Sequence, residues 1–200
     1  MKKTIELIKI SVISTLLFTA VLCIIYPLAV FAMGQLLFPH KANGSLITRK
    51  GDPTIIGSVL IGENFQATHY FHPRPSFAGP EGYDAIHSGA SNFGPTSHKL
   101  NSALHARTSA YRQTNNLPST TQLPVDAATS SASGLDPHIS IANVMLQLPR
   151  VAKARNISEE KLHALVIEHI ERPTWGFLGE ARINVLLLNI ALDESYGGIP

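Results

Sequence analysis

Hydrophobic and polar residues divide the chain into one long apolar segment and a mixed remainder. Residues Ile10 to Pro39 include no Asp, Glu, Lys, Arg or His, and Ile10 to Met33 is almost wholly apolar. A helix needs roughly 20 apolar residues to cross the hydrocarbon of a bilayer. The pattern therefore predicts a transmembrane helix at residues 10–33, preceded by a short head at 1–9 and followed by one domain at 34–200.

A cleaved signal peptide is the main alternative for this segment, with Val30-Phe31-Ala32 as its cleavage site. Signal peptides have an apolar core of about 7–15 residues, and the run here is about twice that length. A lipoprotein signal fits less well, because the bulky Val21 and Leu22 precede Cys23. We therefore favour an uncleaved anchor.

The orientation of the anchor follows from its flanks and from the size of the domain. Basic residues lie on both sides: Lys2, Lys3 and Lys9 before the span, and Lys41, Arg49 and Lys50 after it. The contrast is small, but N-terminal anchors usually keep the N-terminus inside, and long following domains are translocated largely regardless of charge. We expect a single-pass protein of the cell (inner) membrane, with a cytoplasmic head and an extracytoplasmic domain.

Small and weakly polar residues recur at every fourth position of the span, at Ser11, Thr15, Thr19 and Cys23. Such a stripe lets membrane helices approach closely and bond across the contact, which indicates a partner helix. The alternative is that each hydroxyl bonds the preceding turn of its own helix. Pro27 is expected to kink the helix, because it cannot donate a hydrogen bond and its ring clashes with the preceding turn.

The remainder of the chain begins with β-rich and proline-rich segments. Ser45 to Thr48 and Thr54 to Ile61 are typical of strands, separated by a turn at Arg49 to Pro53. His72 to Pro75 alternates with prolines and should be extended and rigid. A long loop follows at Phe77 to Pro95. Loops of this length without secondary structure are usually functional or bound to a partner.

Helices dominate the second half of the prediction. Thr96 or Ser97 can cap a helix that ends near Gln113. Ser140 can cap a second helix, which continues to Arg155 and is bent by Pro149. Ser158 can cap a third helix. Ala181 to Asp193 is apolar nearly all round, which favours a buried helix. The intervening segments are predicted as a polar connector at Asn115 to Pro124, a short strand at Val125 that leads into a Ser/Gly-rich turn, and a break at Pro173 to Gly179. The predicted fold class is α+β: a single N-terminal transmembrane helix followed by one compact extracytoplasmic α+β domain.

Composition and motifs exclude several classes of function. A net charge of +2 does not call for nucleic acid as a partner, and the only cysteine, Cys23, lies in the span. The chain has no phosphate-binding loop, no dinucleotide fingerprint, no nucleophile elbow and no H-E-x-x-H motif. His69 and His72 lie on an extended segment, and His163 and His169 point to different sides of a helix. No metal site is therefore expected.

One catalytic arrangement is open as an alternative. Ser133, Asp136 and His138 supply the residue types of a nucleophile, an orienting acid and a base, as in an anchored extracytoplasmic serine hydrolase. Residues this close in sequence rarely converge properly, and Asp136-Pro137 is more typical of a turn that leads to the helix cap. A free-standing anchored binding module is the second alternative.

Six segments together resemble the C subunit of the Kdp-type potassium-transporting ATPase of bacteria and archaea. They are GSVLIGENF (57–65), YFHPRPS (70–76), SGASNFGP (88–95), SASGLDPHIS (131–140), PRVAKAR (149–155) and FLGEARINVLLLNIALD (177–193). They follow the family's order behind a single N-terminal span. The chain departs from the family pattern at Leu187, where a Glu is usual, and at Met145-Leu146 before Gln147.

The resemblance implies a non-catalytic accessory subunit with no cofactor of its own. Its partners would be a potassium-channel-like subunit and a P-type ATPase subunit that carries the ATP, with membrane lipid around the span. The family's C subunit is needed for assembly and acts as a catalytic chaperone that promotes ATP binding by the ATPase subunit. With no phosphate-binding motif in the chain, we expect that effect to be indirect. Residues of the matching segments would dock the partners, namely Tyr70, Arg74, Ser88, Asn92, Ser133 and Asp136.

Overall fold

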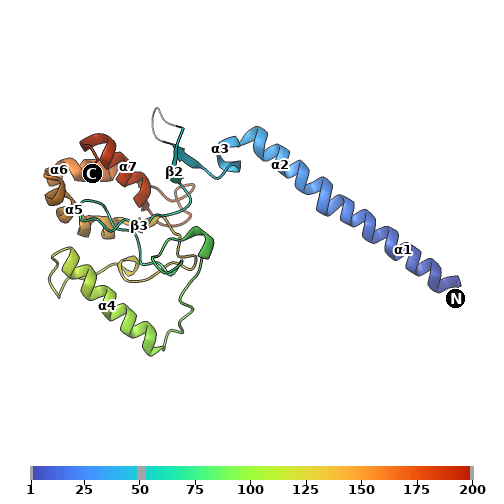
Figure 1. Ribbon diagram of the computed structural model, residues 1–200, viewed down its shortest axis with the longest axis horizontal. Helices are drawn as coiled ribbons and strands as arrows, with labels where there is room; N and C mark the ends of the chain where they lie inside the picture. The colour runs from blue at the N-terminus through green and yellow to red at the C-terminus, as the bar shows by residue number, and fades with distance from the viewer. Residues whose placement is uncertain (1, 49–52, 199–200) are drawn as a thin grey trace. The chain divides into compact units, whose positions relative to one another are not determined.

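The computed structural model describes residues 2–48 and 53–198 (Figure 1). Its contacts divide the chain into two units between Ile56 and Gly57. The predicted turn at Arg49 to Pro53 lies almost entirely outside the described residues, as do the flanking charges of Arg49 and Lys50.

The first unit is mainly one helix of 36 residues, Lys2–Leu37, which is long and apolar enough to cross a membrane. It consists of α1 (Lys2–Thr19), a π-helical segment η1 (Ala20–Ile25) and α2 (Tyr26–Leu37). None of the residues of α1, η1 or α2 is buried in the structure. The predicted helix at residues 10–33 is thus present, and it extends several residues beyond both predicted ends.

The π-helical segment lies immediately before Pro27, where the sequence predicts a disturbance. A proline ring clashes with the carbonyl four residues back and offers no N–H. Here the backbone N–H of Tyr26 bonds the carbonyl of Val21, five residues back, as in a π-helix. The wider turn accommodates the proline without interrupting the helix.

A short connection leads from this helix to the second unit. Helix α3 (Pro39–Ala42) is followed by strands β1 (Leu46–Thr48) and β2 (Ile55–Ser58), which pair in a two-stranded sheet. Both strands fall within the β-rich runs predicted from the sequence. The predicted second run continued to Ile61, but β2 ends at Ser58 and a tight turn follows, closed by a bridge between Ser58 and Ile61.

The second unit packs three helices and a small antiparallel sheet around one core. Its remaining elements are η2 (Ala85–His87), α4 (His98–Thr114), η3 (Val125–Ala127), β3 (His138–Ser140), α5 (Ile141–Arg155), α6 (Glu159–Glu168), β4 (Ile170–Glu171), β5 (Arg182–Asn184) and α7 (Val185–Tyr196). The sheet order is β3-β5-β4, and Ile183 at its centre pairs with Ile139 on one side and Ile170 on the other. Helices α5, α6 and α7 supply most of the core, including Val151, Leu162 and Leu192.

Side-chain caps fix where the core helices begin. Ser140 accepts a hydrogen bond from the Asn143 N–H, and Ser158 accepts one from the Lys161 N–H. Each hydroxyl satisfies a backbone donor that the first turn of a helix leaves free. Both helices therefore start where the sequence predicts, and the α+β fold class with one N-terminal apolar helix is confirmed.

Two predicted elements are wrong. Ala181 to Asp193 was expected to be one helix, but Arg182–Asn184 is the central strand β5, and α7 begins only at Val185 because Asn184 caps it. Short apolar runs of strand and buried helix cannot be told apart by periodicity. Val125 was expected in a strand, but it is the first residue of the 3-10 helix η3. Its side chain is 76% exposed and does not pack against a sheet.

Helix α4 lies at the edge of the second unit, apart from α5, α6 and α7 (Figure 1). It runs from His98 to Thr114 as predicted, but the side chain of Ser97 makes no cap hydrogen bond and no residue of the helix is fully buried. Its main link to the core is Tyr111, whose hydroxyl bonds Asn143 in α5. The helix forms one wall of the cleft described next.

Candidate functional site

The candidate site is built around an extended segment, Tyr70 to Ser76, which we call the ribbon. The prolines at 73 and 75 keep it out of helices and sheets, as predicted. Its backbone is nevertheless bonded by side chains from two core helices. Asn189 of α7 donates to the Phe71 carbonyl at 2.9 Å and accepts from the Phe71 N–H at 2.9 Å. The Asn189 amide thus makes the two hydrogen bonds with the Phe71 backbone that a neighbouring β-strand would make in a sheet.

Gln147 of α5 holds the next residue in the same way. It accepts from the His72 N–H at 2.7 Å and donates to the His72 carbonyl at 3.0 Å. Gln147 is fully buried, and its amide also donates to Asn143, one turn back on α5. The side chain of Phe71, whose backbone Asn189 holds, is completely buried in the core. The ribbon is therefore fixed in position by neutral groups on both sides.

A buried arginine completes this anchorage. Arg150 donates to Asn115 at 2.9 Å, to Gln147 at 2.8 Å and to the backbone carbonyls of Tyr70 and Thr68. All these acceptors are neutral, and only 8% of the residue is exposed. Burial lowers the pKa of the Arg150 guanidinium to about 10, which still leaves it charged at neutral pH.

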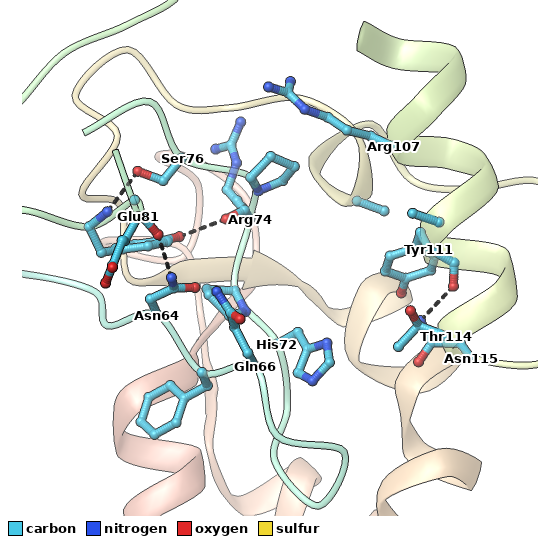
Figure 2. A pocket seen from close by; sticks show the side chains of 17 residues that line it. Asn64, Gln66, His72, Arg74, Ser76, Glu81, Arg107, Tyr111, Thr114 and Asn115 are labelled. Carbon is cyan, nitrogen blue, oxygen red and sulfur yellow. Dashed lines mark hydrogen bonds between the residues drawn. The ribbon is translucent and has the colours of Figure 1, made fainter. Parts of the chain in front are cut away.

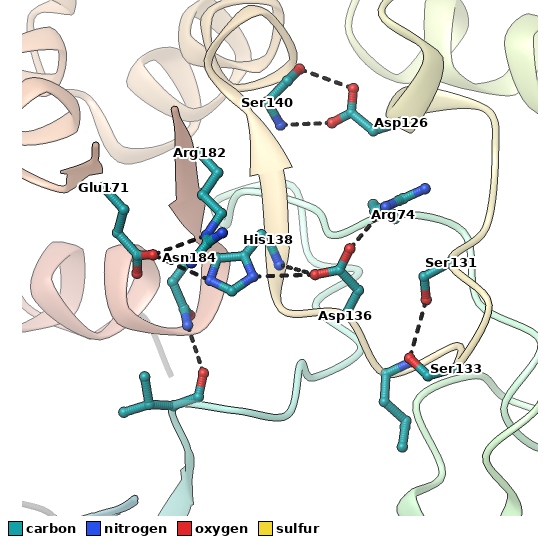
Figure 3. A network of polar contacts seen from close by, with 12 residues as sticks. Arg74, Asp126, Ser131, Ser133, Asp136, His138, Ser140, Glu171, Arg182 and Asn184 are labelled. Atoms are coloured by element: carbon teal, nitrogen blue, oxygen red, sulfur yellow. Dashed lines mark hydrogen bonds and ion pairs between the residues drawn. The ribbon is translucent and has the colours of Figure 1, made fainter. Parts of the chain in front are cut away.

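The other end of the ribbon is held by charges (Figure 3). Arg74 pairs with Asp136 at 2.8 Å, and Asp136 lies 3.2 Å from the Nδ1 of His138. His138 continues to Glu171 at 3.4 Å, and Glu171 pairs with Arg182 at 3.1 Å. We call these five residues the charged chain. Within the three-stranded sheet, His138 lies on β3, Glu171 on β4 and Arg182 on the central strand β5.

Asp136 has the most perturbed carboxyl of the charged chain. Burial acts to raise its pKa, but hydrogen bonds from His138 and Arg74 outweigh that effect and lower it to about 2. Nearby, the Tyr83 hydroxyl donates to the Arg74 carbonyl at 3.0 Å, and burial raises the pKa of this phenol. Asp136 is therefore ionised at neutral pH and fixes the guanidinium of Arg74.

Three of the motif segments meet at a glycine. Gly134 has a φ of +70°, and a Cβ there would lie 2.8 Å from the Ala78 nitrogen and from the Gly89 carbonyl. Ser76 donates to the Gly134 carbonyl at 2.6 Å, and Ser88 donates to the Ser133 carbonyl at 2.9 Å. The ribbon and the loops at 88–95 and 131–136 are thus tied into one structure.

Between the ribbon and α4 lies an open cleft of about 310 Å³ (Figure 2). Arg107 and Tyr111 of α4 line one side, and His72 and Arg74 of the ribbon line the other. Burial and the charge of Arg150 lower the pKa of His72 to about 4, so its imidazole is neutral at neutral pH. The cleft is open and is lined by both polar and apolar groups, which suits a protein segment or a small molecule.

The alternative of a serine hydrolase is not supported by the geometry. The Ser133 hydroxyl accepts from the Leu135 N–H at 3.1 Å and lies 3.5 Å from the Ser131 hydroxyl. Both ring nitrogens of His138 face carboxylates, those of Asp136 and Glu171. The imidazole therefore has no free nitrogen with which to take a proton from Ser133, although the three residues lie in one region.

The histidines considered as metal ligands are otherwise engaged. The His72 ring bonds the Ala67 carbonyl at 3.0 Å, and the His69 ring packs against Tyr70. His169 follows the end of α6 and its Nδ1 bonds the Leu165 carbonyl. Among residues 2–48 and 53–198, no group of three or more His, Cys, Asp and Glu side chains is placed to hold a metal ion.

The residues predicted to dock partners fall into two groups. Tyr70, Arg74 and Asp136 are half-buried; Tyr70 bonds Asp193, and the other two bond each other. Ser88, Asn92 and Ser133 are exposed on the adjoining loops. These contacts explain the local fold, and docking itself stays a prediction. In the span, Ser11, Thr15, Thr19 and Cys23 are exposed along the helix, and within the described residues their side chains have no hydrogen-bond partner.

Comparison with known proteins places this arrangement in a family. A family described as "KdpC: K+-transporting ATPase, c chain" matches residues 8–194. The chain belongs to this family. A relative from Mycobacterium tuberculosis (strain H37Rv), named potassium-transporting ATPase KdpC subunit, is 54% identical over 90% of this chain and 93% of its own length. Relatives of the same name from Nitratidesulfovibrio vulgaris and Caulobacter vibrioides are 48% and 47% identical, over 96% and 93% of this chain and 96% and 92% of their own lengths.

Family membership makes the chain an accessory subunit rather than a catalytic one, and it confirms the resemblance drawn from the six segments. The structure adds residues that the sequence reasoning did not single out. Asn143, Gln147 and Arg150 recur at helical spacing and form a buried polar face on α5. A run of uncharged polar residues ending in an arginine on an otherwise apolar helix is the signal that could have indicated them.

Proposed function

We propose that this chain is the accessory subunit of an ATP-driven potassium uptake complex and is needed for assembly of that complex. The observation that carries the proposal is the family match, which spans residues 8–194, together with relatives that share the name potassium-transporting ATPase KdpC subunit. The proposed partners are a potassium-channel-like subunit and a P-type ATPase subunit. Extraction in mild detergent and mass spectrometry of co-purifying chains test it; purification of the chain without such partners would contradict it.

We further propose that the chain acts as a catalytic chaperone, which raises the affinity of the ATPase subunit for ATP. ATP binds on the partner, and the effect of this chain is indirect, because the sequence carries no phosphate-binding loop. The KM for ATP of the purified ATPase subunit, measured with and without this chain added, tests the effect. A higher KM without the chain is expected, whereas an equal KM would refute the chaperone role.

The orientation proposed is a cytoplasmic head and an extracytoplasmic domain. Support comes from the general behaviour of N-terminal anchors followed by long domains. Protease added outside intact spheroplasts should degrade the domain and leave a membrane-protected stub that ends near His40. Protection of the domain until lysis would reverse the orientation and would reopen direct contact with ATP.

We propose that partners dock on the rim formed by Ser88, Asn92 and Ser133, beside the ribbon. The rim is exposed and is fixed from below by the bond between Ser88 and Ser133. Ala132 lies on the same rim and is exposed, so Ala132→Arg adds bulk there without removing a hydrogen bond. It should reduce co-purification of partners, whereas Thr120→Arg on the exposed connector should not. Equal yields from both variants would place docking elsewhere.

The stripe Ser11, Thr15, Thr19 and Cys23 is proposed to pack against a helix of a partner. Thr15→Leu with Thr19→Leu adds volume and keeps the span apolar, so insertion continues. Loss of close packing and of an interhelical bond is worth about 0.6–2 kcal/mol, which would weaken association several-fold or more. Leu16→Ile with Leu17→Ile is the matched control on other faces. Equal co-purification of the two doubles would show that the stripe makes no such contact.

A further inference from the structure

The turn that joins β4 to β5 exposes an unusual group of large apolar side chains. Trp175 is 82% exposed, Phe177 is 77% exposed and Leu178 is 55% exposed. We call these three residues the tip. Apolar side chains of this size are among those most often buried, and their concentration on one short turn marks a surface that is covered in the working protein.

The tip is rigid, as an anchoring structure must be. Thr174 and Leu178 exchange backbone hydrogen bonds at 2.9 and 3.0 Å, and the Gly176 N–H bonds the Pro173 carbonyl. The rings of Trp175 and Phe177 are held together, with centroids 6.4 Å apart. Below the tip, the ion pair of Arg182 with Glu171 ties the two strands together (Figure 3). The backbone of the turn that carries the aromatic pair is therefore ordered by its own hydrogen bonds.

We propose that the tip inserts into the interfacial layer of the lipid bilayer that holds the anchor. Trp favours this layer, in which its apolar ring body and its polar N–H are both solvated, and Phe177 and Leu178 add apolar contact. Within the described residues the indole N–H of Trp175 has no hydrogen-bond acceptor, so it is free to bond headgroups or interfacial water. Exposed Arg172 and Arg182 flank the turn and supply charges for lipid phosphates.

The size of the tip favours lipid over a protein partner. The three side chains of the tip have roughly 500 Å² of surface that a contact could bury. A stable protein interface buries about 800 Å² on each partner. A bilayer needs no complementary surface, and the anchor already keeps the domain near it. Residues 38–56 follow the long helix and, fully extended, would span at most roughly 65 Å. Tethering makes insertion an intramolecular event, so a small apolar contact suffices.

The chain carries its own reporter for this contact, because Trp175 is its only tryptophan. The full chain is reconstituted in phosphatidylcholine nanodiscs, without other subunits. Part of the lipid carries bromine, either near the headgroup end of the acyl chains or near their terminal methyl. We expect the emission of Trp175 to be blue-shifted in the bilayer. Bromine near the headgroups should remove at least roughly half of its intensity, and bromine near the terminal methyl should remove less.

Two matched double variants separate insertion from mere proximity. Phe177→Ser with Leu178→Ser removes the apolar part of the tip but keeps the reporter, and it should reduce quenching several-fold. Ile86→Ser with Val125→Ser removes two comparably exposed residues elsewhere and should leave quenching unchanged.

Three results would overturn the proposal. They are emission that bromolipid does not quench, equal quenching in both doubles, and shielding of Trp175 that appears only when other subunits are added. The last result would assign the tip to a protein contact. Because the measurement uses the chain alone, its failure says nothing against the proposed role in a potassium-transporting complex.

Discussion

Two parts of the ribbon are held by different kinds of interaction. At Phe71 and His72 the backbone is fixed by uncharged amides, and the acceptors of the nearby Arg150 are neutral. At Arg74 the ribbon is half-exposed and is held by the charged chain. The comparison teaches that uncharged amides fix the backbone of Phe71 and His72, whereas an ion pair fixes the half-exposed side chain of Arg74.

The largest expected effect is at the buried end, at Arg150. Arg150→Met would remove the donor to the carbonyls of Thr68 and Tyr70 and to the side-chain oxygen of Asn115, and unfolding should be easier by about 3–4 kcal/mol. Urea unfolding of the full chain in detergent, followed by far-ultraviolet circular dichroism, measures it. Lys153→Met, on an exposed position of the same helix, is the control; equal loss in both variants would contradict the assigned role.

Asn189 provides the next test. Asn189→Leu keeps the number and branching of the side-chain heavy atoms but leaves the buried N–H and carbonyl of Phe71 unpaired, which should cost about 2–3 kcal/mol of unfolding free energy. Asn101→Leu, on the exposed side of α4, should change it little in the same urea titration. If Asn189→Leu were as stable as the parent chain, the ribbon would not depend on this amide.

His72 extends the comparison to pH. Its folded-state pKa of about 4 lies below the usual 6.5, so the native state binds fewer protons than the unfolded state between these values. Stability should therefore be complete above pH 6.5 and fall by about 2 kcal/mol as the pH is lowered toward 4. His72→Gln should flatten this part of the profile. An unchanged slope in the variant would show that another group titrates there.

The smallest expected effect is at the charged end. Arg74→Gln should cost about 1 kcal/mol, because the pair with Asp136 is partly screened by solvent, and high salt should remove much of the difference. The pKa of Asp136, near 2, lies below its usual 3.8, so its contribution is present above 3.8 and is lost as the pH falls toward 2. Asp136→Asn should lose this acid dependence, and urea titrations at several pH values and salt concentrations would detect it. A salt-independent loss in Arg74→Gln would indicate packing rather than charge.

Local signals in the sequence were enough for the elements that depend on them. Ser140 and Ser158 predict the starts of α5 and α6 because a cap acts within one turn of its helix. The apolar span is predicted because bilayer thickness alone determines its length. The strand at Arg182–Asn184 was missed because its strand character comes from pairing with β3, which is distant in sequence, and with β4 across the turn at residues 172–181.

The candidate site was predicted only in outline. The motif segments were identified through the family resemblance, and the extended ribbon follows from its prolines. That Asn189 and Gln147 bond the ribbon backbone could not be predicted, because each contact joins residues 118 or 75 positions apart. No local pattern indicates which amide on which helix will face a given peptide unit.

These long separations also determine the order of events during synthesis. The anchor helix is complete in the first 37 residues and can enter the membrane while the rest of the chain is still being made. The ribbon cannot take its final place until Asn189 in α7, almost the last element, has left the ribosome. The second unit therefore cannot complete its core during most of its translation, because α7 also supplies core residues such as Leu188 and Leu192. A ribosome stalled before α7 should yield a membrane-inserted chain whose second unit is fully sensitive to protease.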